Sequence, residues 1–216
     1  MGSDRQAGLE GLLRRARIVP VLIVEAVEDA VPLARALAEG GLDVLEITLR
    51  TSAAADAIRA IRDALPDIVV GSGTVLDPRQ LALSEELGCA FAVCPGASPA
   101  LLAAASDRVI PLLSASATPS EAMVLREQGY AVQKFFPAEA CGGTRYLSAI
   151  ASPLPDVSFC PTGGITEANA REYLMLPNVV AVGGSWMAPR RYIADKNWPA
   201  VAEAARIAAS LRMTRT

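Results

Sequence analysis

Short runs rich in β-branched residues alternate with segments rich in Ala, Leu, Arg and Glu along this chain, with no linker or low-complexity stretch between them. This alternation is typical of a parallel sheet whose strands are joined by helices. Eight strands close a (β/α)8 barrel, and the chain lacks the G-x-G-x-x-G motif of an open, doubly wound nucleotide-binding sheet. The pattern therefore predicts an α/β TIM barrel, with the open sheet as the alternative. The eight predicted strands are residues 18–24, 42–49, 68–70, 90–94, 109–113, 131–136, 157–160 and 179–182.

The segments between these strands carry helix signals, and several begin at Ser, Thr, Asp or Pro. A chain of 216 residues is short for this barrel. We therefore expect one domain, residues 1–216, with short loops and a short N-terminal segment. The predicted helices are residues 28–39, 52–64, 78–87, 98–105, 119–128, 143–151, 166–175 and 199–212.

The composition excludes several chemistries. The chain has no histidine, and only two of its 20 basic residues are lysines. Ser-His-Asp hydrolysis and histidine proton shuttling are therefore excluded, and most zinc or iron sites are disfavoured, so we expect no metal. Proton transfer falls to carboxylates, lysines, thiols or tyrosines.

Charge and hydropathy limit the partners and the compartment. The net charge of -3 without a basic block argues against nucleic-acid binding, and no apolar stretch is long enough to cross a bilayer. Four cysteines form no C-x-x-C pair, and the first 17 residues lack the apolar run of a signal peptide. We expect a cytoplasmic protein with reduced thiols.

The second predicted strand, DVLEITLR, places polar residues on one face. Its alternation puts Glu46, Thr48 and Arg50 together, with Leu45 and Ile47 directed toward the helices. Catalytic groups of barrels lie near the carboxyl ends of strands, which favours a functional role. A structural Glu–Arg pair or a helix-capping role is the alternative.

The sixth predicted strand contains a lysine in an apolar run, AVQKFFPAE. Lys134 shares a face with Val132 and Phe136. Burial disfavours the charged form of a lysine, and a neutral amine is a nucleophile. The alternative is an ion pair with Glu46 or Glu139. Lys196, in ADKNWP, is predicted to lie at the surface.

Glycine turns follow three predicted strands: GSGT at 71–74, PTGGI at 161–165 and GGSW at 183–186. The last two follow strands seven and eight, where barrels commonly bind phosphate through backbone N–H groups. Thr74 and Thr162 place hydroxyls at the same end of the barrel. Cys94 and Cys160 also lie near strand ends, and we interpret both as core residues.

The motifs KFFPAE, LEITLRT, GSGTV, FCPTGGI and GGSW and the C-P-G turn at 94–96 occur together over residues 10–210. The combination resembles the 2-keto-3-deoxy-6-phosphogluconate (KDPG) aldolases, class I Schiff-base aldolases of the Entner–Doudoroff pathway. The resemblance implies a homotrimeric, cofactor-free lyase that cleaves this phosphorylated keto acid to pyruvate and glyceraldehyde 3-phosphate.

By matching motif, the resemblance implies that Lys134 forms the imine and that Glu46 moves the protons. Arg50 and Thr74 are implied to hold the pyruvate carboxylate, and Thr162 to influence stereochemical preference at C4. The full set implied to contact substrate is Arg50, Thr74, Pro95, Phe136 and Thr162, and the set implied to bind phosphate is Gly163, Gly164, Gly184 and Ser185.

One loop departs from the family pattern. After the fifth strand the family commonly has a Pro-Gly-Ile-Ser/Thr turn, and this chain has LSASAT at 113–118. The shape of the aldehyde side of the pocket is therefore open. Alternative substrates are 4-hydroxy-2-oxoglutarate and the galactonate epimer of the phosphorylated keto acid. An alternative of another class is a non-catalytic sugar-phosphate sensor, in which Lys134 pairs with phosphate.

Overall fold

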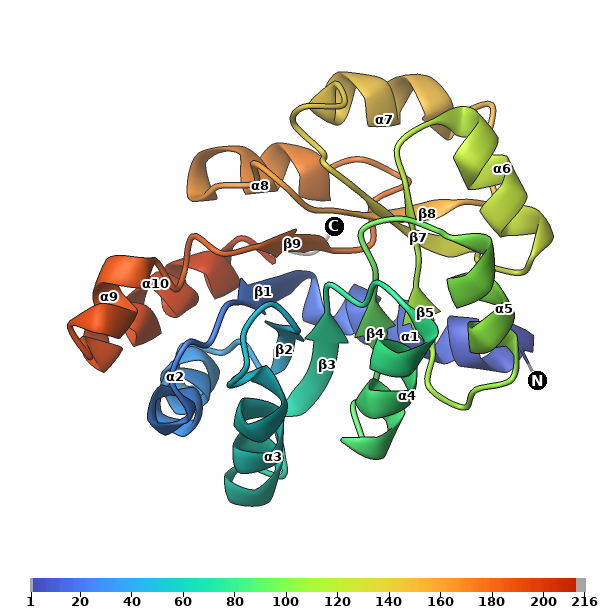
Figure 1. Cartoon of the computed structure of the whole chain (residues 1–216). Coiled ribbons are helices and arrows are strands. Elements are labelled where there is room, and N and C mark those ends of the chain that lie inside the picture. The colour runs from blue at the N-terminus through green and yellow to red at the C-terminus, as the bar shows by residue number, and fades with distance from the viewer. Residues whose placement is uncertain (1, 213–216) are drawn as a thin grey trace.

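Parallel strands surround a common interior in the computed structural model, which describes residues 2–212 (Figure 1). One sheet has the strand order β5-β4-β3-β2-β1-β9 and the other β6-β7-β8. Isolated bridges from Phe159 to Val179 and from Thr162 to Gly183 join the two sheets on one side. On the other side, Ser114 lies between β5 and β6, and its carbonyl accepts the Lys134 N–H at 2.9 Å. The predicted TIM-like α/β fold is confirmed.

The strands are β1 (Ile18–Leu22), β2 (Val44–Thr48), β3 (Val69–Gly73), β4 (Ala92–Val93), β5 (Leu112–Leu113), β6 (Ala115–Ser116), β7 (Val132–Phe135), β8 (Ser158–Pro161) and β9 (Val182–Gly184). The helices are α1 (Gly2–Ala16), α2 (Val27–Glu39), α3 (Ala54–Ala64), α4 (Pro78–Glu86), α5 (Pro99–Ser106), α6 (Pro119–Glu127), α7 (Gly143–Ala151), α8 (Glu167–Leu174), α9 (Arg190–Ala194) and α10 (Trp198–Ser210). None of these helices, within residues 2–212, has both the length and the apolar character needed to cross a bilayer.

Local signals fix where several helices begin. The Asp77 carboxylate accepts the N–H groups of Arg79 and Gln80, and Pro78 occupies the first turn of α4. Thr118 and Glu121 form a capping box at the start of α6. These side chains satisfy N–H groups that have no partner within the helix, so each helix starts at a defined residue.

Strand residues alternate between the barrel interior and the surrounding helices. Leu45 and Ile47 of β2 belong to the cluster packed against the helices, and Val44 belongs to the interior cluster. Leu9 and Leu13 of α1 are buried in that interior cluster. Helix α1 therefore closes one end of the barrel, and the sequence had predicted only a short segment there.

The fifth strand differs from its prediction. Residues 109–113 were expected to form it, but β5 starts at Leu112 and is interrupted at Ser114 before β6. The N–H groups of Val109 and Ile110 donate to the Glu85 carboxylate at 2.7 and 3.1 Å. Their backbone is bonded to the end of α4, which keeps these residues out of the sheet.

Candidate active site

A lysine and a glutamate meet inside the barrel. Lys134 lies in β7, opposite Ala115 of β6 and Cys160 of β8. Glu46 lies in β2, opposite Val21 of β1 and Gly71 of β3. The Lys134 Nζ is 3.8 Å from the Glu46 Oε1, and the side chains are only 6% and 5% exposed. The strand periodicity had predicted that both residues face the interior, and the structure brings them together.

Because both groups are buried, the Lys134–Glu46 pair adds little to the stability of the folded state. At an effective dielectric constant of about 20, unit charges near 4 Å attract by about 4 kcal/mol. Removing each ion from water costs several kcal/mol, which offsets the attraction. The separation of 3.8 Å also exceeds hydrogen-bond length, and Glu46 Oε1 is buried without a hydrogen-bond partner. A buried carboxylate oxygen without a hydrogen bond is costly to fold, and the chemistry of Glu46 is the better reason for its presence.

The environment of Glu46 favours its protonated form. Burial raises the pKa of the Glu46 carboxyl above its usual value of 4.5, and the charge of Lys134 opposes the shift. A raised pKa makes the carboxylate a stronger base, which helps it to accept and return a proton. Glu46 therefore has the properties of a general base and acid.

Gly73, at the end of β3, provides the space for the Glu46 carboxylate. A Cβ atom added at Gly73 would lie 2.1 Å from Glu46 Oε1 and 2.7 Å from its carboxyl carbon. Any side chain at position 73 must displace this carboxylate. The sequence analysis identified GSGT as a glycine turn and named Thr74 in it, but it assigned no role to Gly73. The contact between Gly73 and Glu46 depends on the register between β2 and β3.

An aromatic ring and two thiols surround the lysine. The Lys134 Nζ is 5.1 Å from the centroid of the Phe136 ring, within cation–π range. Cys94 and Cys160 are buried, and burial raises the pKa of both thiols, that of Cys160 to about 12. Both remain protonated at neutral pH and are not nucleophiles, which agrees with their interpretation as core residues.

Two residues expected beside Glu46 have different surroundings. The Thr48 hydroxyl donates to the Leu22 carbonyl at 2.9 Å and so links β2 to β1. The strand alternation that placed Arg50 on the same face as Glu46 does not extend to Arg50, because β2 ends at Thr48. The Arg50 N–H donates to the Thr48 carbonyl at 2.8 Å, and this turn leaves Arg50 exposed. Its role in holding a carboxylate stays a prediction.

The turn after β8 has a backbone that requires glycine. Gly163 and Gly164 have φ values of 98° and 79°, and a Cβ at Gly164 would lie 2.5 Å from Glu139 Cγ. The Thr162 and Gly163 carbonyls accept the N–H groups of Ala138 and Glu139 at 2.8 and 3.1 Å. These two hydrogen bonds from residues 138–139, which follow β7, hold the turn after β8 beside the carboxyl end of β7, the strand that carries Lys134.

The turn after β9 lies next to the turn after β8. Gly183 forms a bridge with Thr162, and a Cβ on Gly183 would lie 2.4 Å from the Thr162 hydroxyl oxygen. Gly184 is buried at the end of β9, and Ser185 after it is exposed. The bridge between Thr162 and Gly183 therefore brings together the two turns that carry the predicted phosphate-binding residues. Thr74, after β3, is half-buried with a φ of 56°, which places it in a strained turn.

The altered loop after the fifth strand forms a cavity with two predicted site residues. Pro95 and Phe136 line a space of about 100 Å³ together with residues 115–117 and Glu121. The Ser116 hydroxyl donates to Gln133 Oε1 at 2.7 Å, and the Glu121 carboxylate accepts the Ala117 N–H at 2.8 Å. The sequence LSASAT therefore forms an ordered wall beside Phe136.

Known proteins show the family of this chain. Residues 9–204 match the model of the KDPG and KHG aldolase family. The KHG/KDPG aldolase of Escherichia coli K12 is 51% identical over 180 residues, covering 83% of this chain and 84% of that protein. The 2-dehydro-3-deoxy-phosphogluconate aldolase of Pseudoalteromonas atlantica is 47% identical over 206 residues, covering 95% of this chain and 96% of that protein.

A solved structure agrees with these relatives. The KDPG aldolase of Legionella pneumophila, with pyruvate captured at low pH as a covalent carbinolamine intermediate, superposes with a TM-score of 0.89. It is 43% identical, and the match covers 91% of this chain and 96% of that one. The family match and the named relatives identify an aldolase, and the barrel with its buried Lys134 and Glu46 agrees with this class. This chain belongs to the KDPG and KHG aldolase family.

Proposed function

We propose that this chain cleaves 2-keto-3-deoxy-6-phosphogluconate to pyruvate and glyceraldehyde 3-phosphate, with Lys134 as the nucleophile and Glu46 as the proton carrier. The buried pair of these two side chains, 3.8 Å apart, carries the proposal. The name of the P. atlantica relative and the covalent pyruvate in the L. pneumophila structure support it.

The cleavage follows from the chemistry of the two groups. The neutral amine of Lys134 adds to the C2 ketone, and loss of water gives a protonated imine. The Glu46 carboxylate removes the proton of the C4 hydroxyl, directly or through a water molecule. The C3–C4 bond then breaks, its electrons pass into the imine to form an enamine, and the aldehyde leaves. Glu46 returns the proton to C3, and hydrolysis releases pyruvate and the amine.

The remaining predicted residues would bind the substrate. The glycine turns at 163–164 and 184 would offer backbone N–H groups to the phosphate, and Ser185 a hydroxyl. Thr74 and Arg50, which follow β3 and β2, would hold the carboxylate. Thr162, Pro95 and Phe136 would contact the carbon chain. The closeness of the turns after β8 and β9 supports a shared phosphate site.

The name of the E. coli relative favours a second substrate, 4-hydroxy-2-oxoglutarate. This keto acid offers the same C2 ketone and C4 hydroxyl but has no phosphate. Lys134 and Glu46 would act on it in the same way, without the contribution of the glycine turns. We therefore propose it as the slower substrate.

Cleavage rates on three compounds test the proposal. Pyruvate release is measured with the phosphorylated gluconate compound, its galactonate epimer and 4-hydroxy-2-oxoglutarate. The proposal expects the highest kcat/KM for the gluconate compound. A higher value for either other compound reassigns the substrate. Release from none of them, in folded protein that binds the phosphorylated compound, supports the alternative of a sugar-phosphate sensor.

We also propose a homotrimer in the cytoplasm. All four cysteines are free, as a reducing compartment requires, and the trimer follows from family resemblance. Sedimentation equilibrium tests the assembly, with a mass near three times 22.5 kDa as the expected result.

A further inference from the structure

The turn after β8 is held in place by hydrogen bonds to its carbonyl groups. The Thr162 and Gly163 carbonyls accept N–H groups of the backbone that follows β7. The Gly164 carbonyl accepts a side-chain donor instead, the Nδ2 of Asn169, at 3.1 Å. Asn169 lies in the first turn of α8, whose N-cap is Thr166. The last carbonyl of this turn therefore depends on one side chain.

The Asn169 amide is bonded at both ends. Its Oδ1 accepts the Thr166 N–H at 2.8 Å, and its Nδ2 donates to the Gly164 carbonyl. An amide with one partner on its oxygen and another on its nitrogen has a single orientation that satisfies both. The start of α8 therefore fixes the direction of the Gly164 carbonyl.

The direction of this carbonyl decides the direction of an N–H group. The peptide between Gly164 and Ile165 is planar and trans, so the Ile165 N–H points away from the Gly164 carbonyl. Neither the Gly164 N–H nor the Ile165 N–H has an acceptor within residues 2–212. Two successive N–H groups without a protein acceptor are typical of an anion-binding turn. Because the Gly164 carbonyl faces α8, the Ile165 N–H faces the opposite side.

Without the bond to Asn169, the Gly164 peptide could turn over. Gly164 has a φ of 79° and no Cβ, so rotation of its peptide meets little steric resistance. Rotation by half a turn would direct the carbonyl oxygen to the side of the N–H groups, where it would repel a phosphate. We propose that Asn169 is a positioning residue for the phosphate of the substrate. This role rests on the proposed function, which places the phosphate at this turn.

Isothermal titration calorimetry with inorganic phosphate tests this role without catalysis. Asn169→Ala removes the donor to the Gly164 carbonyl, and loss of one hydrogen bond corresponds to about fivefold weaker binding. In steady-state assays, KM for the phosphorylated gluconate compound should rise by the same factor and kcat should stay unaltered. KM for 4-hydroxy-2-oxoglutarate, which has no phosphate, should not change.

Thr166→Ala is the matched control on the same helix. Both hydrogen bonds of the Asn169 amide go to backbone atoms, so they persist when the Thr166 side chain is removed. The substitution takes away the capping hydroxyl of α8 and should lower the melting temperature without changing phosphate affinity. A purely structural role of Asn169 in starting α8 would give both variants the same phosphate affinity.

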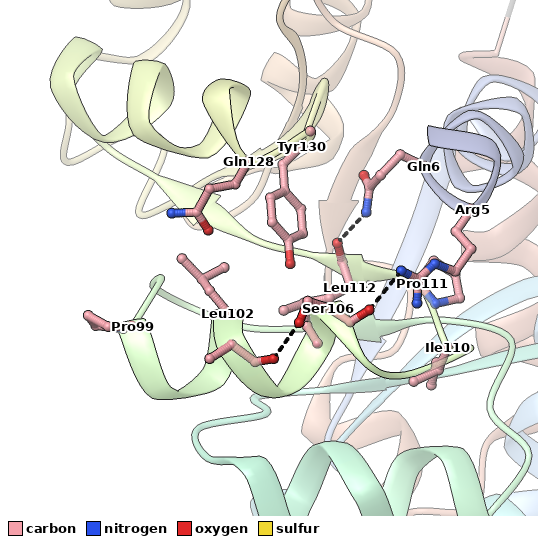
Figure 2. A pocket seen from close by; sticks show the side chains of 13 residues that line it. Arg5, Gln6, Pro99, Leu102, Ser106, Ile110, Pro111, Leu112, Gln128 and Tyr130 are labelled. Atoms are coloured by element: carbon pink, nitrogen blue, oxygen red, sulfur yellow. Dashed lines mark hydrogen bonds between the residues drawn. The ribbon is translucent and has the colours of Figure 1, made fainter. Parts of the chain in front are cut away.

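Gln128→Ala is the control for loss of a distant side-chain amide. Gln128 precedes β7 and lines a cavity of about 620 Å³ together with Gln6 and Tyr130 (Figure 2). Gln128 therefore lies at the amino end of its strand, whereas the turn after β8 lies at a carboxyl end. This variant should bind phosphate as the unaltered protein does.

Asn169→Asp separates the two bonds of the amide. A carboxylate still accepts the Thr166 N–H and suits the first turn of a helix, but it cannot donate to the Gly164 carbonyl. This variant should start α8 normally and bind phosphate at least about fivefold more weakly. Unaltered phosphate affinity in Asn169→Asp would overturn the proposal, even if Asn169→Ala failed to fold.

Ser185→Ala distinguishes failure of this role from failure of the proposed function. Weaker phosphate binding in Ser185→Ala with unaltered binding in Asn169→Ala would overturn the role of Asn169 and leave the phosphate site in place. Weaker binding in Asn169→Ala alone, in a protein that does not cleave the phosphorylated compound, would overturn the proposed cleavage and support the role. Unaltered binding in both variants, or equal losses in Asn169→Ala and Thr166→Ala, would overturn the role.

Discussion

The Nζ of Lys134 and the Oε1 of Glu46 lie 3.8 Å apart, each on a side chain with almost no exposure to solvent. The distance is short enough for electrostatic coupling and too long for a direct hydrogen bond. A substrate hydroxyl or a water molecule can therefore take part in proton transfer between them.

Replacing Glu46 by Gln should remove the proton carrier and keep the shape of the side chain. We expect kcat for cleavage to fall about 10²- to 10⁴-fold, the usual contribution of a general base. Steady-state pyruvate release measures the effect. Glu86→Gln, at an exposed carboxylate on α4, is the matched control and should retain full activity. A Glu46→Gln enzyme with unaltered kcat would remove Glu46 from the mechanism.

The acid limb of the pH–rate profile should report Glu46. Burial raises the pKa of this carboxyl above 4.5, and the base must be ionised to act. As pH falls through the raised pKa, Glu46 becomes protonated and kcat declines. The midpoint of that limb should therefore lie above pH 4.5. A profile that remains flat down to pH 4.5 contradicts the assignment.

Gly73→Ala should impair catalysis through the position of the Glu46 carboxylate. The added methyl group would lie 2.1 Å from Glu46 Oε1, so the carboxylate must move away. A displacement of about 1 Å can cost about 10²-fold in rate, and we expect kcat to fall by this order.

Gly11→Ala is the control for this substitution, because a Cβ at Gly11 meets nothing within 4 Å and the residue lies in α1. It should keep full activity and raise the free energy of unfolding by about 0.5–1 kcal/mol. Full activity in Gly73→Ala would show that the carboxylate position is not critical.

Much of the site could be predicted from local patterns. The period of two in β2 and β7 placed Glu46 and Lys134 in one interior, because inward and outward residues alternate along a strand. The position of Arg50 could not be predicted in this way, since the pattern does not show that β2 ends at Thr48.

Contacts between residues far apart in the sequence account for the other differences between the predicted and the observed structure. The late start of the fifth strand depends on Glu85, which is distant in sequence from Val109. Helix α1 escaped prediction because Gly8 and Gly11 weaken its helical signal, whereas burial of Leu9 and Leu13 in the barrel stabilises it. The role of Gly73 depends on strand register.

Ser185→Ala should separate phosphate binding from the carbon chemistry. The residue is exposed after β9, so the substitution should leave the fold unchanged. Loss of one hydrogen bond to a charged group should raise KM for the phosphorylated substrate about tenfold. KM for 4-hydroxy-2-oxoglutarate should stay the same. An equal rise for both substrates would place Ser185 outside the phosphate site.

Thiol reactivity should follow burial. Cys89, Cys94 and Cys160 are buried, and burial raises the pKa of all three thiols, that of Cys89 to about 11. Because the thiolate is the reactive form, these three should resist iodoacetamide at pH 7.5 until the protein unfolds. Cys141, which is half-buried, should react first. Peptide mass mapping of the alkylated protein decides this, and early labelling of Cys160 would show an open barrel interior.

The central claim is that Lys134 forms a covalent imine with the keto acid. Incubation with pyruvate and borohydride, followed by peptide mapping, tests it directly. The predicted result is a single reduced pyruvate adduct on Lys134, with none on Lys196, which is exposed. An unmodified Lys134, or an adduct only on Lys196, would contradict the account.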